Sequence, residues 1–174
     1  ATADGLASFY DYSQVDRRRV AKPSAPMFFV TASQTNLLLA EAKFRGWITT
    51  ATTADEFFAN GIRAHMDQMV VHDGASAVSG AARDTYVTDH PLVVGRELEQ
   101  INTQYWIASF LNGPEAFANF RRTGFPALTP NPYGQPSNPD VPNGTFIRRI
   151  GYPTSELSVN TENVNAAIGL MGAD

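Results

Sequence analysis

The sequence has 174 residues, of which 43% are hydrophobic and 17% charged, and its formal net charge is -4. This size and composition are typical of a globular domain with a sizeable core and exclude a disordered chain. The negative balance gives no broad basic field for a phosphate backbone, so we expect no nucleic-acid partner. Cysteine is absent from the sequence, which excludes disulfides, thiol catalysis and cysteine-ligated metal sites within it.

An irregular stretch and then a helix hairpin are predicted first. Residues 1–28 show no strong periodicity and contain prolines that stop a helix. Good helix formers predict a helix over residues 32–46, with Gly46 as its C-terminal cap. A second helix is predicted over residues 53–70, where Thr53 can serve as the N-cap.

Both of these helices have an apolar face. On the first, Leu37, Ala40 and Phe44 share one side. The second helix has a stripe at steps of three and four, formed by Phe58, Ile62, His65, Met66 and Met69. The second helix also carries a small residue, an aromatic residue and another small residue at Ala54, Phe58 and Gly61. This is the spacing of a tetratricopeptide unit, in which small residues let two helices approach closely.

A second helix pair is predicted in the middle of the chain. Residues 71–90 are polar and predict a loop or a short helix. Residues 94–113 predict the longest helix, with two apolar stripes, so we expect it to be buried between neighbours. Residues 114–122 predict a short helix that ends at Gly124, with Asn112 or Gly113 as its cap. Of the aromatic residues here, Tyr105, Trp106 and Phe110 are predicted to form the inner helix seam, and Phe117 and Phe120 to clamp the short helix onto it.

The last part of the chain is rich in proline. Seven of the eleven prolines lie between Phe125 and Pro153, which excludes a helix there and predicts a long ordered loop or surface wrap. A short strand is possible within residues 141–150, and residues 160–172 predict a closing helix. The fold class predicted from these elements is all-α with long loops.

Four sequence blocks in a fixed order carry a family resemblance. They are LLLAEAKFRGW, ADEFFANGIRAHMDQM, LNGPEAFANFRRTGFP and RRIGYPTSE. With their separations, they resemble the C-terminal half of the SusD/RagB-type proteins, the outer-membrane glycan-binding lipoproteins of Bacteroidetes. The resemblance covers roughly residues 29–170 and implies tetratricopeptide-like helix hairpins with a long Pro-rich loop region.

This resemblance has functional implications. Such proteins are not enzymes and need no cofactor; they lie on the cell surface, are tethered to the outer membrane by a lipid on an N-terminal cysteine, and deliver oligosaccharide to a SusC-type TonB-dependent transporter. Full-length members are about three times as long as this chain. We therefore expect residues 1–174 to be the C-terminal portion of one SusD-like domain, stable only with its own N-terminal portion as partner. Within it, residues 29–70 are the tetratricopeptide-like pair, 94–124 the second pair and 125–174 the Pro-rich wrap and closing helix.

The resemblance also limits the expected binding residues. The family's sugar-contacting aromatics lie largely on N-terminal and central loops, so most of them should be missing here. The nearest candidates are Tyr10 and Tyr12, while Tyr133 is a third because it lies in a turn-rich loop. Trp47, at the turn of the first hairpin, is interpreted as packing on missing helices.

Other chemistries are weakly supported by the residues. His65 and His72 are seven positions apart, too far for the usual metal-binding pair on one helix, so His65 is interpreted as a structural histidine of the apolar stripe. The carboxylate pairs Asp55/Glu56, Glu97/Glu99 and Glu115 with Glu156 do not predict a glycosidase, because paired catalytic carboxyls must face each other across a cleft.

The paired arginines are interpreted as structural. Arg121 and Arg122 lie at a helix C-terminus and are expected to bond carbonyls there or in the Pro-rich wrap, and Arg148 and Arg149 are read in the same way. The alternative function that we considered is a tetratricopeptide-like adaptor for another protein. A solenoid of such units needs about three repeats, whereas this sequence predicts one.

Overall fold

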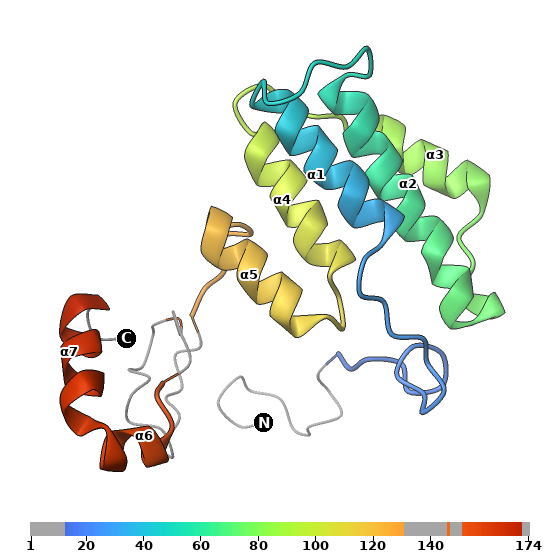
Figure 1. The fold of residues 1–174 in the computed structure, drawn as a ribbon. Coiled ribbons are helices and arrows are strands. Elements are labelled where there is room, and N and C mark those ends of the chain that lie inside the picture. Colours follow the sequence, from blue (N-terminus) through green and yellow to red (C-terminus); the bar gives the residue numbers. More distant parts are fainter. Residues whose placement is uncertain (1–12, 131–145, 147–150, 172–174) are drawn as a thin grey trace. The chain divides into compact units, whose positions relative to one another are not determined.

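The computed structural model describes residues 13–130, 146 and 151–171. Within these ranges the regular elements are all helices, which confirms the all-α class. The chain divides into two compact units, Ala1–Pro126 and Ala127–Asp174. The first unit contains α1 (Ala32–Phe44), α2 (Ala54–His72), the 3-10 helix η3 (Gly74–Ser76), α3 (Gly80–Asp89), α4 (Glu97–Ala108) and α5 (Gly113–Thr123), and the second contains α6 (Thr154–Val159) and α7 (Thr161–Met171) (Figure 1).

Helices α1 and α2 form the tetratricopeptide-like hairpin, and both begin as their sequences predict. Thr31 and Thr53 each start a helix with a capping box, in which the threonine hydroxyl accepts from the third helical N–H and the side chain of that residue bonds back. The two helices are very close at Gly61, where an added Cβ would lie 2.6 Å from Leu37 Cγ. Ser33 Oγ also donates to the Gly61 carbonyl at 2.8 Å, so the small residue at this crossing is required by packing.

The core of the first unit lies where α1, α2 and α4 meet (Figure 1). Its buried members come from all three helices and from α3, and they are Leu37, Ala40, Phe58, Ile62, Val87, Ile101, Tyr105 and Ala108. Helix α5 packs against α4 and ends at Gly124, whose φ of 75° is in the left-handed region that favours glycine.

Helix α4 differs from its prediction in length and in burial. It spans Glu97–Ala108, so α2, with 19 residues, is longer than α4, with 12. The stripe through Ile101 and Tyr105 is buried, but Trp106 and Phe110 are 36% and 59% exposed. The prediction of a helix buried on two sides was therefore wrong for this unit, because α1, α2 and α5 together cover only part of the α4 surface. Phe44 is likewise 43% exposed rather than part of the α1 core face, and Phe117 is 37% exposed rather than fully clamped.

The polar segment 71–90, for which we predicted a loop or a short helix, contains a short helix. Helix α3 starts at the N-cap Ser79, whose hydroxyl accepts from Ala82 N–H at 3.2 Å, and packs against α2. In the second unit, α7 agrees with the predicted closing helix, whereas α6 begins directly after Pro153 and was not expected. The possible strand within residues 141–150 lies almost entirely outside the described residues.

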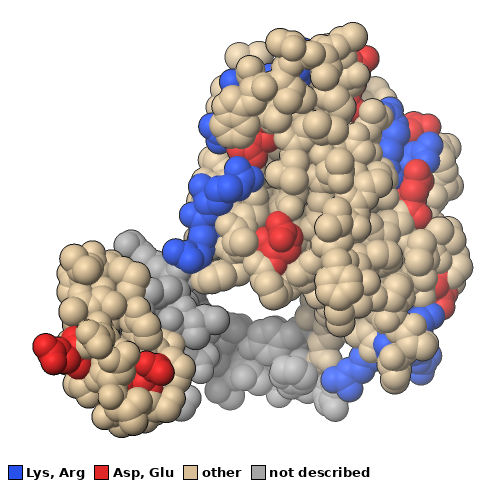
Figure 2. Space-filling model, viewed as in Figure 1, with Lys and Arg blue, Asp and Glu red and all other residues tan. Residues whose placement is uncertain are grey.

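Charged side chains are scattered over the face of the molecule that Figure 2 draws. On the face drawn in Figure 2, acidic and basic side chains are interspersed among uncharged ones and no broad basic area is visible. A search of the described residues for a helix both long and apolar enough to cross a bilayer found none.

Candidate functional site

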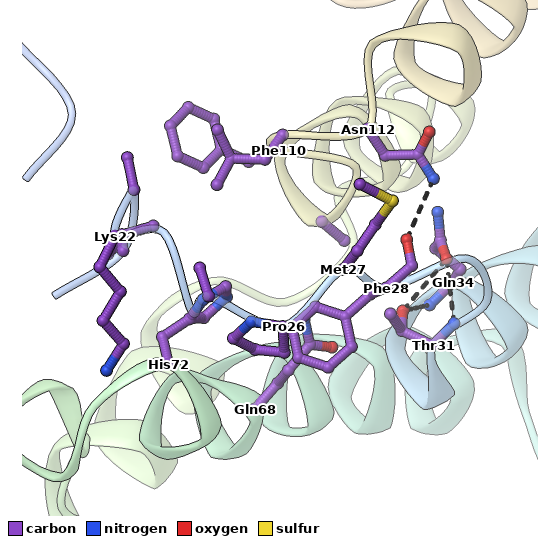
Figure 3. A pocket seen from close by; sticks show the side chains of 15 residues that line it. Lys22, Pro26, Met27, Phe28, Thr31, Gln34, Gln68, His72, Phe110 and Asn112 are labelled. Carbon is purple, nitrogen blue, oxygen red and sulfur yellow. Dashed lines mark hydrogen bonds between the residues drawn. The ribbon is translucent and has the colours of Figure 1, made fainter. Parts of the chain in front are cut away.

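The three predicted glycan contacts, Tyr10, Tyr12 and Tyr133, lie outside the described residues and stay predictions. Within the first unit, a pocket of about 250 Å³ is formed mainly by three segments (Figure 3). They are the stretch 20–28 that precedes α1, the C-terminal end of α2 and the turn between α4 and α5. We take this pocket as the candidate site.

The stretch that precedes α1 has no regular structure but has a defined course. The carboxylate of Asp16 accepts from the backbone N–H of Arg18 at 2.8 Å and of Arg19 at 3.2 Å, closing a turn ahead of the pocket. Lys22 then forms an ion pair of 3.7 Å with Asp73, just after α2. These contacts place the following residues against the end of α2.

The turn between α4 and α5 supplies an apolar side of the pocket. Leu111 has a φ of 68°, which is uncommon for a residue with a side chain and lets the chain reverse sharply after Phe110. Asn112 accepts from Glu115 N–H at 3.4 Å and donates to the Phe28 carbonyl, also at 3.4 Å (Figure 3). One side chain thus caps α5 and joins this turn to the stretch before α1.

The capping box of α1 contributes two more pocket residues, and it is fully hydrogen-bonded. Thr31 N–H donates to Gln34 Oε1 at 3.0 Å, and Gln34 N–H donates to Thr31 Oγ1 at 3.1 Å. Gln34 Nε2 also donates to Ser109 Oγ at 3.2 Å, which links the start of α1 to the end of α4. This part of the lining is therefore polar but already satisfied.

His72, the last residue of α2, is the exception. It is 8% exposed, and its Nδ1 atom is buried with no hydrogen-bond partner among the described residues. The ring meets Phe28 edge to face, with centroids 5.3 Å apart and an interplanar angle of 79°. A buried polar atom without a partner costs free energy and is rare in folded proteins, so Nδ1 of His72 is the polar atom of this lining that the described residues leave unsatisfied.

The pocket lining therefore combines apolar walls with a few polar groups. The apolar parts include Pro26, Met27, Phe28 and Phe110, and polar side chains come from Lys22, Gln68, His72, Asn112 and the Thr31–Gln34 capping box (Figure 3). This mixture is typical of sites for small molecules, in which apolar surface gives affinity and a few polar groups fix orientation.

A second polar cluster connects α1, α4 and α5. Glu41, 2% exposed at its side chain, accepts two hydrogen bonds from Arg122, at 2.8 and 2.9 Å. Arg122 also donates to Asn102 Oδ1 at 3.1 Å and Asn119 Oδ1 at 3.0 Å, and Arg45 Nε donates to Glu41 at 2.8 Å. Burial acts to raise the pKa of Glu41, but hydrogen bonds from Arg122 and then Arg45 outweigh it and the pKa is lowered.

This cluster settles the role of one of the paired arginines. Arg122 has the structural role that we predicted, but its partners are a carboxylate and two amides of helices rather than carbonyls of the Pro-rich wrap. Arg121 lies over the Phe117 ring, 5.8 Å from its centroid. Arg148 and Arg149 lie outside the described residues.

The carboxylates considered for catalysis have other contacts. Glu56 belongs to the capping box of α2, Glu97 accepts from Gly95 N–H at 2.8 Å, and Glu99 pairs with Arg96 at 2.7 Å. Glu115 accepts from the Tyr105 hydroxyl at 2.7 Å; burial first, and then this hydrogen bond, raises the pKa of Tyr105. Each of these acids thus has a structural contact that accounts for its position.

The histidines are not gathered into a metal site. A search of the described residues found no group of three potential metal ligands. His65 is partly buried, and desolvation, followed by the nearby His72, lowers its pKa, which agrees with a structural histidine on the α2 stripe. His90 stacks on Tyr86, with ring centroids 4.0 Å apart. Trp47 is 68% exposed with the Arg45 guanidinium 5.1 Å from its ring centroid.

Sequence reasoning missed the pocket itself. It considered His72 only as a metal ligand and placed Phe110 in the helix seam, and it left Phe28 unassigned. The available signal was indirect: His72 ends an apolar stripe, and the Asn-Gly-Pro turn after Phe110 requires a sharp change of direction. Neither signal shows that residues 20–28 lie against His72 and Phe110.

Comparison with known proteins gives two kinds of match. The family model SusD-like_2, described as starch-binding and associating with the outer membrane, matches residues 2–153. Among solved structures, a chitin-binding protein is 39% identical, with a TM-score of 0.73 over 87% of this chain and 32% of that one. A structure titled Bacteroidetes AC2a SusD-like is 32% identical, with a TM-score of 0.67 over 82% of this chain and 27% of that one. The chain therefore spans about a third or less of the length of these two structures. No curated protein matches the sequence.

Proposed function

Because the chain belongs to the SusD-like family of starch-binding proteins that associate with the outer membrane, we propose that it is part of a non-catalytic receptor for oligosaccharide at the bacterial cell surface. The observation that carries this proposal is the family match over residues 2–153. The structural contacts made by the candidate catalytic acids, Glu97, Glu99 and Glu115, are consistent with binding without bond cleavage.

Two glycan classes are candidates for the ligand. The family description points to starch, and the name of the 39% identical structure points to chitin. In either case the receptor would hold the polysaccharide through aromatic and hydrogen-bonding side chains. Tyr10, Tyr12 and Tyr133 stay proposed as contacts on the sequence argument alone.

The receptor would pass its ligand to a SusC-type TonB-dependent transporter in the outer membrane. A lipid on an N-terminal cysteine would hold it at the surface; because this sequence contains no cysteine, that residue would belong to another part of the protein. Co-purification of the transporter with the tagged native-length protein, and protease sensitivity of the protein on intact cells, test the partner and the location separately.

Residues 1–174 would then be the C-terminal portion of one SusD-like domain and would pack against an N-terminal portion. The observation in favour is the apolar surface of the first unit, where Leu38, Phe44 and Trp47 are 45%, 43% and 68% exposed. Leu38 and Phe44 lie on α1 and Trp47 follows it, and large exposed apolar side chains close together in the chain often mark a surface that another part of the protein covers. Hydrogen exchange of the native-length protein should show α1 more protected than in the isolated 174 residues.

The experiment that tests the proposed function is calorimetric titration of native-length protein with soluble fragments of starch, chitin and other polysaccharides. We expect one class to bind with measurable heat and no fragment to be shortened during the titration. If no glycan binds and no transporter co-purifies, the proposed function is wrong.

A further inference from the structure

We propose that the Asp16 turn, which spans residues 16–21, and the adjoining His72 pocket, the pocket of about 250 Å³ at the end of α2, together bind a glycan that carries acidic groups. Arg17 and Arg18 hold a carboxylate or sulfate of the glycan at the edge of the pocket. This inference rests on the proposed function, because it names the chemical class of the glycan. Three features carry it: the fixed backbone of the turn, the open charges of its arginines and its position beside the pocket.

The backbone of the Asp16 turn is held by its own hydrogen bonds. The Asp16 carboxylate accepts from the N–H groups of Arg18 and Arg19, at 2.8 and 3.2 Å. The Asp16 carbonyl accepts from the N–H groups of Val20 and Ala21, both at 2.9 Å. The arginine side chains of the turn are exposed. Because their backbone is already fixed, less conformational entropy is lost when they bind a ligand.

Arg17 and Arg18 have no acidic partner in the described part of the chain. Arg19, by contrast, forms an ion pair of 3.8 Å with Asp16. Most other described arginines also pair with a carboxylate, and these are Arg45, Arg63, Arg83, Arg96 and Arg122. A guanidinium group matches the paired oxygens of a carboxylate or sulfate, so two adjacent open ones favour an acidic ligand group.

The turn leads directly into the pocket. Val20 and Ala21, which close the turn, line the pocket, and so does Lys22, which follows it (Figure 3). Lys22 forms an ion pair of 3.7 Å with Asp73, which attaches this edge of the pocket to the end of α2. The open arginines therefore lie within a few residues of the pocket lining, where they can bond a group of the same glycan that enters the pocket.

The pocket favours a sugar over other anionic partners. Met27, Phe28 and Phe110 contribute apolar lining (Figure 3), on which the C–H face of a sugar ring can pack. A concave space of about 250 Å³ suits one ring of a glycan, whereas a flat lipid surface cannot enter it. The formal net charge of -4 opposes the phosphate backbone of a nucleic acid.

The test compares acidic oligomers with neutral forms of the same backbone. Native-length protein is titrated in a calorimeter with oligomers of galacturonic acid, of mannuronic acid and of sulfated galactose, and with the methyl-esterified or desulfated form of each. We expect at least one acidic oligomer to bind about fivefold more tightly than its neutral form, the effect of two exposed ion pairs. This preference should shrink when the salt concentration is raised from about 0.05 to about 0.5 M.

A double variant locates the preference in the turn. Arg17→Gln with Arg18→Gln should weaken binding of the acidic oligomer about fivefold and leave binding of its neutral form unchanged. The matched control is Arg96→Gln with Arg121→Gln, which removes the same charge from exposed residues that do not line the pocket. The control should keep both affinities of the wild type.

Phe110→Ala tests whether the pocket takes part. It removes an exposed piece of the apolar lining and should weaken binding of the acidic and the neutral oligomer alike, about threefold, so that the preference for the acidic one persists. Because Phe110 is 59% exposed, we expect the variant to fold. Phe44→Ala is the control, because Phe44 does not line the pocket, and it should change neither affinity.

The outcomes separate this inference from the proposed function. The acidic-glycan site is overturned if no acidic oligomer is preferred to its neutral form, if the preference survives the loss of Arg17 and Arg18, or if Phe110→Ala binds as the wild type does. Binding to vesicles of phosphatidylglycerol without any such preference also overturns it and assigns the arginines to a lipid surface. Tight binding of neutral starch fragments and of no acidic oligomer overturns it but supports the proposed function. No binding of any glycan counts against both.

Discussion

The two polar sites of the first unit lie toward opposite ends of α1. They differ in whether their buried polar group has hydrogen-bond partners. Toward its C-terminal end, the buried carboxylate of Glu41 bonds to Arg122 and Arg45, and the amides of Asn102 and Asn119 complete the arrangement. Toward its N-terminal end, the pocket contains His72, whose buried Nδ1 has no partner in the described residues. Burial is similar at both sites, so burial does not distinguish them.

What distinguishes them is whether each polar group is satisfied. A satisfied buried cluster fixes helices relative to one another and leaves nothing for a ligand to bond. Beside the pocket, Arg17 and Arg18 form no ion pair with the described residues, so their donors are open to a ligand. We therefore expect substitutions in the Glu41–Arg122 cluster to change stability and substitutions in the His72 pocket to change binding.

The largest expected effect on stability is that of Arg122→Met. It leaves the Glu41 carboxylate with Arg45 as its remaining charged partner and removes the donor to Asn102 Oδ1 and Asn119 Oδ1. Breaking a buried ion pair costs about 3–5 kcal/mol; because the Arg122 side chain is 44% exposed, we expect about 2–3 kcal/mol after solvent screening. Chemical denaturation measures the loss.

Arg121→Met is the matched control for that substitution. Arg121 is the neighbouring arginine, but its only charge-related contact among the described residues is the Phe117 ring, so the change should cost less than about 0.5 kcal/mol. Equal losses for the two variants would show that the Glu41 cluster does not hold the helices together.

The next effect depends on pH. The pKa of Glu41 in the folded state is below its ordinary value of 4.5, so the ionised form contributes stability that is fully present above pH 4.5 and is lost as the pH falls through the lower folded value. Glu41→Gln should therefore cost about 1.5–2 kcal/mol at pH 7, the lower part of the range for hydrogen bonds to charged groups, because the Arg45 and Arg122 side chains are 35% and 44% exposed and are screened by solvent. The difference between wild type and variant should shrink below pH 4.5 in thermal unfolding, and a difference that stays constant down to pH 3 would contradict the account.

A smaller effect is expected where α1 crosses α2. Gly61→Ala would place a methyl 2.6 Å from Leu37 Cγ, a branch carbon of a side chain that is 1% exposed and has nowhere to move. Overpacking costs about 1–3 kcal/mol and the better helix propensity of alanine returns about 1 kcal/mol, so we expect a net loss of about 1 kcal/mol. Gly80→Ala, whose Cβ would meet its nearest neighbour at 3.8 Å, should cause no loss in the same denaturation assay.

The smallest effect on stability is that of Phe110→Ala. Because Phe110 is 59% exposed, its removal should lower the free energy of unfolding by less than about 1 kcal/mol, no more than Phe44→Ala does. A thermal shift assay of the two variants side by side checks this. A loss as large as that of Arg122→Met would make Phe110 a stability residue and remove the contrast between the two sites.

Local signals in the sequence were enough for the helices. Thr31 and Thr53 cap α1 and α2, and Gly124 ends α5, because capping depends on residues within one turn. The predicted bounds of α4, residues 94–113, were wrong: its apolar pattern continues to Leu111, but the helix spans Glu97–Ala108 and the residues beyond it form the turn.

Long-range partners could not be read from the sequence. Glu41 lies in an apolar run, and its main partner, Arg122, is 81 residues away. The exposed stripe of Trp106 and Phe110 was predicted to be buried because periodicity identifies an apolar face without identifying what covers it. The pocket was missed for the same reason, since residues 20–28 have no periodicity that would place them beside His72.

The most direct test of the central claim is one titration series on native-length protein. The acidic oligomer that binds wild type most tightly is titrated into wild type, Phe110→Ala and an Arg122→Lys variant that keeps the charge. The account predicts weaker binding for Phe110→Ala at unchanged stability, and unchanged binding for Arg122→Lys at lower stability, because lysine cannot form the paired hydrogen bonds of arginine. Binding that follows stability in both variants, or that is absent from wild type for every glycan tried, would contradict it.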